Sequence, residues 1–239
     1  MRPEGARHFR GVIMAEILLP ANKPEDWRPY LGDPVKHWKT GCSAKTLAYC
    51  WQESDGFPKE FKTVFDNAGT PFAQLVPLLI LPEHKVALPG RSTASQSDLW
   101  ILAKTGRELV SITVEGKVSE SFNKPVEDWL RKDSKGKQRR LAFLIKTLGI
   151  SDSFDRSIRY QLLHRTASAI IEAERFLASR AMMIVHSFSR TDEWFDDFAA
   201  FAGLFSITPE INKVLTAKTA RGIPLHLAWI HGDEKYLKK

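Results

Sequence analysis

The chain has 239 residues, of which 43% are hydrophobic, so a large domain with a complete core is expected and disorder is not. Its formal net charge of +7 suits contact with phosphate backbones, although many unrelated proteins are equally basic. No apolar run reaches membrane-spanning length, and the first residues are too broken in hydrophobicity for a signal peptide. We therefore expect a cytoplasmic protein without membrane contact.

The chain is predicted to form one main domain preceded by an irregular arm. Residues 1–35 carry five prolines among mixed charges, which favours a poorly regular N-terminal arm. Residues 36–239 are predicted to form a single domain, with a basic helical insertion at about 123–150.

Two helices are expected ahead of the sheet. Residues 43–53 place apolar side chains on one side of a helix that Ser43 can cap, and residues 58–67 follow as a second helix. Cys42 and Cys50 would lie on the first helix, ~12 Å apart at ~1.5 Å per residue, which is too far for a disulfide. We expect both cysteines to be packing residues rather than zinc ligands.

The next segment leads to a loop that contains glycine. Residues 73–81 are apolar and compatible with either a strand or a helix, and residues 84–88 are predicted to form a strand. Residues 90–97 are rich in small and hydroxyl side chains, which predicts a loop. Such a loop can approach a phosphate closely, or it can be an ordinary connection.

A β-hairpin is predicted near the middle of the chain. Residues 99–103 and 109–114 are short apolar runs typical of strands, and the polar segment 104–108 contains a glycine and fits the loop between them. In an antiparallel pair, the start of the first strand lies beside the end of the second. Charged residues at these two positions are therefore expected to be neighbours.

Three charged residues at this end of the hairpin suggest a metal-dependent reaction. Asp98 opens the first strand, whereas Glu115 and Lys117 close the second and share one of its faces. Carboxylates are preferred ligands of Mg²⁺ and Mn²⁺, and such a cation lowers the pKa of bound water and neutralises charge on a reacting phosphate. A lysine beside the cation could orient the attacking water. The alternative is a surface hairpin whose charges are merely solvated.

The hairpin resembles the catalytic hairpin of the PD-(D/E)XK, or restriction-endonuclease-like, nuclease superfamily. The matching residues are Asp98, Glu115 and Lys117, with Ser97 at the position of the nominal proline. The resemblance implies a central mixed β-sheet flanked by helices. It also implies that Asp98, Glu115 and the carbonyl of Gly116 hold Mg²⁺ or Mn²⁺, and that Lys117 assists the attacking water.

Members of this superfamily usually supply an additional acid from the element before the hairpin. The resemblance makes Glu83 the favoured additional metal ligand, ahead of Glu53 and Glu120.

The longest helix is predicted over residues 157–179, where apolar residues recur at i, i+3 and i+4 spacing. Gln161 and Arg165 lie on a polar stripe beside the apolar one. Because a helix after the catalytic hairpin often lines the cleft in the superfamily, the resemblance gives Gln161 a part in catalysis and Arg165 a part in substrate binding. A stripe that simply faces solvent is the alternative.

Three segments also resemble a family of bacterial proteins described only as a domain of unknown function. They are residues 88–98, 114–122 and 158–165. This resemblance covers nearly the whole chain after about residue 30.

The densest positive stretch separates two short predicted helices, 126–131 and 139–148. Its lysines and arginines are candidates for contact with the backbone of nucleic acid, although basic runs are also common on solvated faces. The candidates are Arg131, Lys132, Lys135, Lys137, Arg139 and Arg140, together with Arg165 of the next helix.

The end of the chain completes the predicted sheet. Residues 181–185 form a continuous apolar run, which predicts a central strand buried on both faces. A helix is expected over residues 194–205 and a final strand over residues 224–230. His164 and His186 are expected to be hydrogen-bonded structural residues. The order of elements predicts an α/β (α+β mixed) fold with a restriction-endonuclease-like core.

These residues favour divalent-metal-dependent hydrolysis of phosphodiester bonds in nucleic acid, most of all in DNA. Two alternatives stay open on the same fold: a catalytically inactive nucleic-acid-binding module, and a protein-interaction module whose basic face meets an acidic partner. Nucleic acid is the expected partner, and a protein partner or a homo-oligomer stays open.

Overall fold

The computed structural model describes residues 16–17, 21–90, 92–132, 134–220 and 222–239. Its elements follow one another as β1 (Glu16–Ile17), the 3₁₀ helix η1 (Pro24–Tyr30), α1 (Pro34–His37), α2 (Ser43–Gln52), α3 (Lys59–Ala68), β2 (Val76–Val86), β3 (Ser95–Thr105), β4 (Glu108–Lys117), α4 (Val126–Leu130), α5 (Lys135–Leu148), α6 (Tyr160–Arg175), β5 (Arg180–Ser187), α7 (Phe195–Gly203), β6 (Val214–Ala220), β7 (Ile223–His231) and the 3₁₀ helix η2 (Glu234–Lys238).

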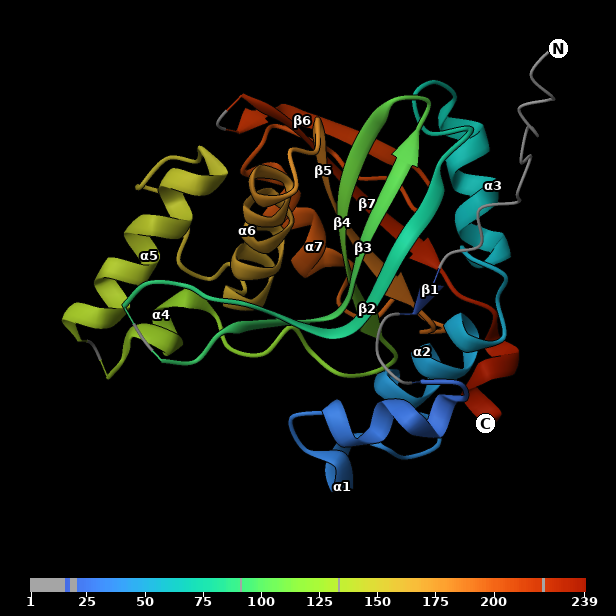
Figure 1. Ribbon diagram of the computed structural model, residues 1–239. Helices are drawn as coiled ribbons and strands as arrows, with labels where there is room; N and C mark the ends of the chain where they lie inside the picture. Colours follow the sequence, from blue (N-terminus) through green and yellow to red (C-terminus); the bar gives the residue numbers. More distant parts are fainter. Residues whose placement is uncertain (1–15, 18–20, 91, 133, 221) are drawn as a thin grey trace, which may run out of the picture.

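A seven-stranded mixed sheet with the order β1-β2-β3-β4-β5-β7-β6 forms the centre of the molecule (Figure 1). Strands β2, β3 and β4 are antiparallel neighbours, and β5 and β7 continue in parallel from β4. At the edges, β6 is antiparallel to β7 and β1 is parallel to β2. The predicted mixed α/β fold, with a mixed sheet flanked by helices, is confirmed.

Helices cover both faces of the sheet, and β5 separates two hydrophobic cores. Its residues Ala181, Met183 and Val185 pack into the core that contains α5, α6 and α7, whereas Met182 and Ile184 pack into the core that contains α2 and α3. Figure 1 shows these helix groups on opposite sides of the strands, with α5 outside α6. The continuous apolar run of β5 follows from this double burial.

The predicted hairpin is formed by β3 and β4, with Leu99 opposite Val114 and a turn at Gly106, whose φ is +57°. Both strands are longer than predicted, because β3 begins at Ser95 and β4 ends at Lys117. The three candidate residues of the hairpin therefore lie within strands, where the backbone ladder restricts their directions.

The structure corrects the prediction for residues 73–88. A single strand, β2 (Val76–Val86), joins the larger part of the two predicted segments, 73–81 and 84–88, because β3 pairs with it along almost its whole length, with one register shift between Pro77 and Leu79. Strand β6 was not predicted at all. It is an edge strand whose one neighbour is β7, so burial imposes little apolar patterning on it.

Helix α6 is shorter than the predicted 157–179 at both ends. Arg159 instead makes a bridge with Pro125, and Leu177 takes a left-handed φ of +54°, which ends the helix. At α2, Cys42 rather than Ser43 occupies the N-cap position. Cys42 and Cys50 are both free, as predicted.

The described part of the predicted N-terminal arm contains local structure. Residues 24–30 form η1, and the buried indole of Trp27 donates a hydrogen bond of 3.0 Å to Gln52 Oε1. The rest of the predicted arm, residues 1–15 and 18–20, lies outside the described residues. In the part that is described, no helix combines the length and the apolar character needed to span a membrane.

Candidate active site

Strands β3 and β4 bring the two acids of the hairpin to one place. The pairing of Leu99 with Val114 sets Asp98 beside the end of β4, where the Gly116 N–H donates a hydrogen bond of 2.8 Å to Asp98 Oδ2. A Cβ at position 116 would lie 3.5 Å from this oxygen and 3.3 Å from Leu47. The distance to Asp98 is an ordinary van der Waals contact and the distance to Leu47 is tight, so a larger residue at position 116 would press on Leu47 rather than on the acid.

Glu115 is the centre of a buried network of charged and polar side chains. Its Oε1 accepts hydrogen bonds from Lys117 Nζ at 2.8 Å and Gln161 Nε2 at 2.6 Å, and its Oε2 accepts one from Arg165 Nε at 2.6 Å. Burial by itself would raise the pKa of Glu115, but the nearby Arg165 and Lys117 charges outweigh burial and lower the pKa. Glu115 is therefore a stable carboxylate whose two oxygens are fully engaged.

Helix α6 is fixed to β4 by hydroxyl groups of the strand. Ser111 Oγ donates to the carbonyl of Ala169 at 2.8 Å, and Thr113 Oγ1 donates to the carbonyl of Arg165 at 3.1 Å. These bonds orient the helix so that Gln161 and Arg165, one turn apart, both point at the end of the hairpin. The two helix residues expected near the hairpin are thus brought to it.

Strand β2 contributes Glu83 to the same place. The flanking pairs Pro82–Leu99 and His84–Ser97 place it opposite Asp98. Its backbone has a φ of +54°, a conformation that non-glycine residues rarely adopt and that clusters at functional sites.

The carboxyls of Glu83 and Asp98 are crowded with negative charge. Burial and the neighbouring Asp98 raise the pKa of Glu83 to about 8. Burial and the neighbouring Glu115 raise the pKa of Asp98 to about 7, against the opposing effects of Lys117 and Arg165. Any additional positive charge at this point would stabilise both carboxylates.

The network faces a cavity of about 640 Å³. Residues of the α1–α2 region also line it, and Glu120, another lining residue, accepts a hydrogen bond of 2.7 Å from the N–H of Ser43, the first residue of α2. The predicted site residues that line the cavity are Glu83, Asp98, Glu115, Lys117, Gln161 and Arg165. These six residues thus border one cavity, although Glu115 and Lys117 are themselves buried.

Two of the three acids can offer an oxygen to a hard divalent cation, whereas the third is already hydrogen-bonded. Asp98 Oδ1 and Glu83 Oε1 receive no hydrogen bond from any described residue, so both oxygens are available as ligands. However, Glu83, Asp98 and Glu115 do not bring one oxygen each within 4.8 Å of one another. Glu115 would also have to exchange one of its N–H donors to become a ligand.

A family model described as a domain of unknown function, DUF6946, matches residues 20–234. The chain belongs to the DUF6946 family. The expected membership of a family without an assigned function is thereby confirmed, while the resemblance to PD-(D/E)XK nucleases stays a prediction. Searches among curated proteins and among solved structures found no match.

The basic stretch of the DUF6946 chain separates into exposed and inward-facing residues. Arg140 is buried, and its guanidinium donates to the carbonyls of Leu88 and Pro89, each at 3.0 Å. Lys137 is half-buried, and its Nζ donates to the carbonyl of Trp129 at 2.5 Å. The four that face solvent are Arg131, Lys132, Lys135 and Arg139.

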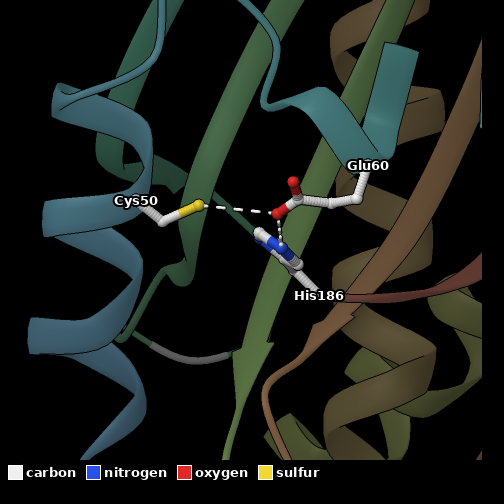
Figure 2. A group of neighbouring side chains, drawn as sticks. All are labelled: Cys50, Glu60 and His186. Carbon is white, nitrogen blue, oxygen red and sulfur yellow. Dashed lines mark hydrogen bonds and ion pairs between the residues drawn. The ribbon is translucent and has the colours of Figure 1, made fainter. Parts of the chain in front are cut away.

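A second cluster has the composition of a metal site but not its hydrogen bonding. Figure 2 shows Cys50 from α2, Glu60 from α3 and His186 from β5, whose ligand atoms lie within 4.8 Å of one another. The Trp51 indole donates to His186 Nδ1 at 3.2 Å, so the neutral ring carries its proton on Nε2 and donates it to Glu60 at 3.0 Å. A metal bound to Nε2 would move the proton of the neutral ring to Nδ1. The indole N–H of Trp51 would then face another N–H instead of an acceptor.

We interpret this DUF6946 cluster as a structural hydrogen-bond network, consistent with the structural role expected for His186. Burial lowers the pKa of His186 despite the carboxylate of Glu60 beside it. Burial and the same carboxylate raise the pKa of the Cys50 thiol, which donates to Glu60 Oε1 at 3.6 Å.

Sequence reasoning missed one partner of the acidic residues. Gln96 Nε2 donates a hydrogen bond of 2.6 Å to Glu83 Oε2 and lines the same cavity. The available signal was period-two alternation, which puts Gln96 on the same face of β3 as Asp98.

Proposed function

We propose that this protein is a divalent-metal-dependent phosphodiesterase that hydrolyses nucleic acid, with DNA as the first candidate substrate. The observation that carries the proposal is the convergence of Asp98, Glu115 and Lys117, with Gln161 and Arg165, at one accessible cavity. Carboxylates beside fixed cationic donors suit a reaction at a phosphate, which carries negative charge that increases during attack.

In this proposal, water adds to phosphorus and the bond from phosphorus to the leaving sugar oxygen breaks. The attacking water gives up a proton to the solvent, and the leaving sugar oxygen takes one up to become a hydroxyl group. When bound, Mg²⁺ or Mn²⁺ would lower the pKa of the attacking water and neutralise negative charge on the phosphate. Asp98 and Glu83 would hold the cation through Asp98 Oδ1 and Glu83 Oε1, the oxygens that receive no hydrogen bond from the described residues. Lys117, kept in place by Glu115, donates a hydrogen bond to the attacking oxygen or to the phosphate, and Arg165 adds positive charge.

The basic surface supports nucleic acid as the substrate class. The exposed residues Arg131, Lys132, Lys135 and Arg139 lie on or beside α4 and α5, which follow the catalytic hairpin in the chain. Neutralising phosphates with such side chains releases condensed counterions, so binding should weaken steeply as salt is added.

A second candidate function is supported by the bonding of Glu115. Its two oxygens are already satisfied by Lys117, Gln161 and Arg165. Because the charge of Glu115 is balanced by residues of the protein itself, this acid does not need a metal ion. This arrangement suits a catalytically inactive module that binds nucleic acid on the same fold.

Cleavage of plasmid DNA and of labelled oligonucleotides with Mn²⁺ tests the proposal. Asp98→Asn and Lys117→Met should each lower the rate at least about 100-fold, because each removes charge from the reacting centre. Lys62→Met, on the exposed side of α3, is the matched control and should cleave like the wild type. Equal cleavage by all four proteins would mean a contaminating nuclease, whereas salt-dependent binding without cleavage in any divalent metal would favour the binding module.

A further inference from the structure

A smaller cavity of about 180 Å³ is lined by the same helix, α6, as the acidic one. It lies between the loop before β3, helix α5 and the first turns of α6. No acidic side chain is found among the described residues that line it. The residues used below are Thr93, Ser95, Trp129, Arg140, Tyr160 and His164, all of which line this cavity.

The two cavities share helix α6. Tyr160 and His164 form one i, i+4 stripe that lines the small cavity, and Gln161 and Arg165 form the next stripe, which lines the acidic cavity. Arg165 connects them, because its Nε donates to Glu115 Oε2 at 2.6 Å and its Nη1 to Ser95 Oγ at 3.4 Å. A ligand bound in one cavity would therefore lie next to a ligand bound in the other.

His164 lines the small cavity, and the tautomer of its ring follows from its neighbours. Ser95 Oγ lies 2.8 Å from His164 Nδ1, and the donor-only guanidinium of Arg165 lies 3.5 Å from the same nitrogen. Nδ1 is therefore an acceptor, and the proton of the ring is on Nε2. Burial, with the Arg165 and Arg140 charges, lowers the pKa of His164 well below its usual range, which keeps the ring neutral.

Arg140 presents a fixed positive charge at the same cavity. Its guanidinium donates to the carbonyls of Leu88 and Pro89 at 3.0 Å and to Thr93 Oγ1 at 3.4 Å, and the residue is only 4% exposed. Because these oxygens hold the guanidinium plane, an incoming anion would meet a preorganised group.

The aromatic residues distinguish between a nucleobase and a phosphate as the ligand. Trp129 stacks on Tyr160 with ring centroids 4.0 Å apart, and Tyr160 in turn contacts the ring of His164 at 4.8 Å. Lys137 Nζ lies 5.5 Å from the centroid of Trp129. The faces of these rings are therefore already covered by neighbouring side chains. Little aromatic surface is left on which a base could stack.

We infer that the small cavity binds a phosphate group through Arg140, the Nε2–H of His164 and the hydroxyl of Thr93. Phosphate oxygens carry negative charge and accept hydrogen bonds. Arg140 supplies positive charge, and the ring N–H of His164 and the hydroxyl of Thr93 can each donate a hydrogen bond. Resting on the proposed function, the natural source would be a phosphate of the strand whose neighbouring linkage occupies the acidic cavity. Free inorganic phosphate has the same chemistry.

Binding of a fluorescent single-stranded oligonucleotide, measured by anisotropy without divalent metal, tests this inference. His164→Phe and Thr93→Val should each weaken binding, the former by roughly 10-fold because a hydrogen bond to a charged group is lost. Thr63→Val, an equivalent change on the exposed side of α3, is the matched control and should bind like the wild type. Far-ultraviolet circular dichroism checks that each variant is folded.

A scan with single uncharged methylphosphonate linkages identifies the phosphate. At one position, the uncharged linkage should weaken binding to the wild type. The same replacement should not weaken binding to His164→Phe any further, because that variant has already lost the contact. In a parallel arm, inorganic phosphate should raise the melting temperature of the wild type more than that of His164→Phe. A shift in this arm alone supports the site even if DNA is neither bound nor cleaved. Equal responses of His164→Phe and the wild type in both arms would overturn it.

Discussion

At Glu115, three N–H donors meet two carboxylate oxygens in a place where solvent hardly reaches, since the residue is 2% exposed. Lys117 and Arg165 supply the positive charge that keeps this acid ionised, and the same charges restrain the raised pKa of Asp98. A buried ion pair of this kind adds little net stability, but breaking it leaves a charge without compensation.

Replacing Arg165 with leucine should therefore destabilise the protein strongly. We expect a loss of about 3 kcal/mol in the free energy of unfolding, measured by urea denaturation, because Glu115 loses its closest guanidinium. Adding Glu115→Gln should restore part of the loss. Arg131→Leu is the control, because its pair with Asp128 is 80% exposed on the arginine side, and it should change little. Equal effects of Arg165→Leu and Arg131→Leu would contradict this account.

At the scale of elements, two glycines join the connection between β2 and β3 to helix α5. A Cβ at Gly90 would lie 2.1 Å from the carbonyl oxygen of Gly136, and a Cβ at Gly136 would lie 2.1 Å from that of Gly90. Figure 1 shows this connection reaching away from the sheet to α5. The basic helix and the loop that precedes Ser95 are thereby held together.

Gly136→Ala should destabilise the protein, although alanine is the better helix former. Helix propensity alone predicts a gain of up to ~1 kcal/mol, whereas the clash with Gly90 should cost about 1–3 kcal/mol. Gly203→Ala in α7 is the control, because a Cβ there meets nothing within 4 Å, and its melting temperature should be unchanged or higher. A Gly136→Ala variant at least as stable as the wild type would disprove the close packing.

At the scale of the whole molecule, the central strands bury histidines without ionising them. His226 in β7 is 2% exposed, contacts the ring of Phe72 at 4.8 Å, and has Thr216 as its hydrogen-bond partner at 3.1 Å. Burial, with a smaller effect from Arg180, lowers its pKa from 6.5 to about 4. Protonation must therefore favour the unfolded chain.

The free energy of unfolding should fall with pH in a defined window. Above pH 6.5 His226 is neutral in both states, and below about pH 4 it is protonated in both, so its contribution is lost as the pH drops between these values. The contribution is about 3 kcal/mol from the size of the shift. In urea titrations from pH 7 to 4, His226→Phe should flatten the decline relative to the wild type. An identical decline would show that other groups cause it.

The sequence alone determined the hairpin, its charged end and the buried strand β5. Alternation in β3 and β4 put Asp98, Glu115 and Lys117 at one end of the hairpin, and i, i+4 spacing put Gln161 and Arg165 on one stripe of α6. These are local regularities, set by the period of a strand or a helix. Neighbouring residues in the chain carry enough information to fix them.

Tertiary structure alone decided which groups meet. That Arg140 turns inward, that Gln96 holds Glu83, and that Arg165 spans Glu115 and Ser95 depends on contacts between elements far apart in the chain. The edge strand β6 also forms only because β7 offers it a partner. Charge and spacing specify the type of a side chain and its face, but the direction of a long polar side chain is chosen by the partners that packing brings within hydrogen-bond distance.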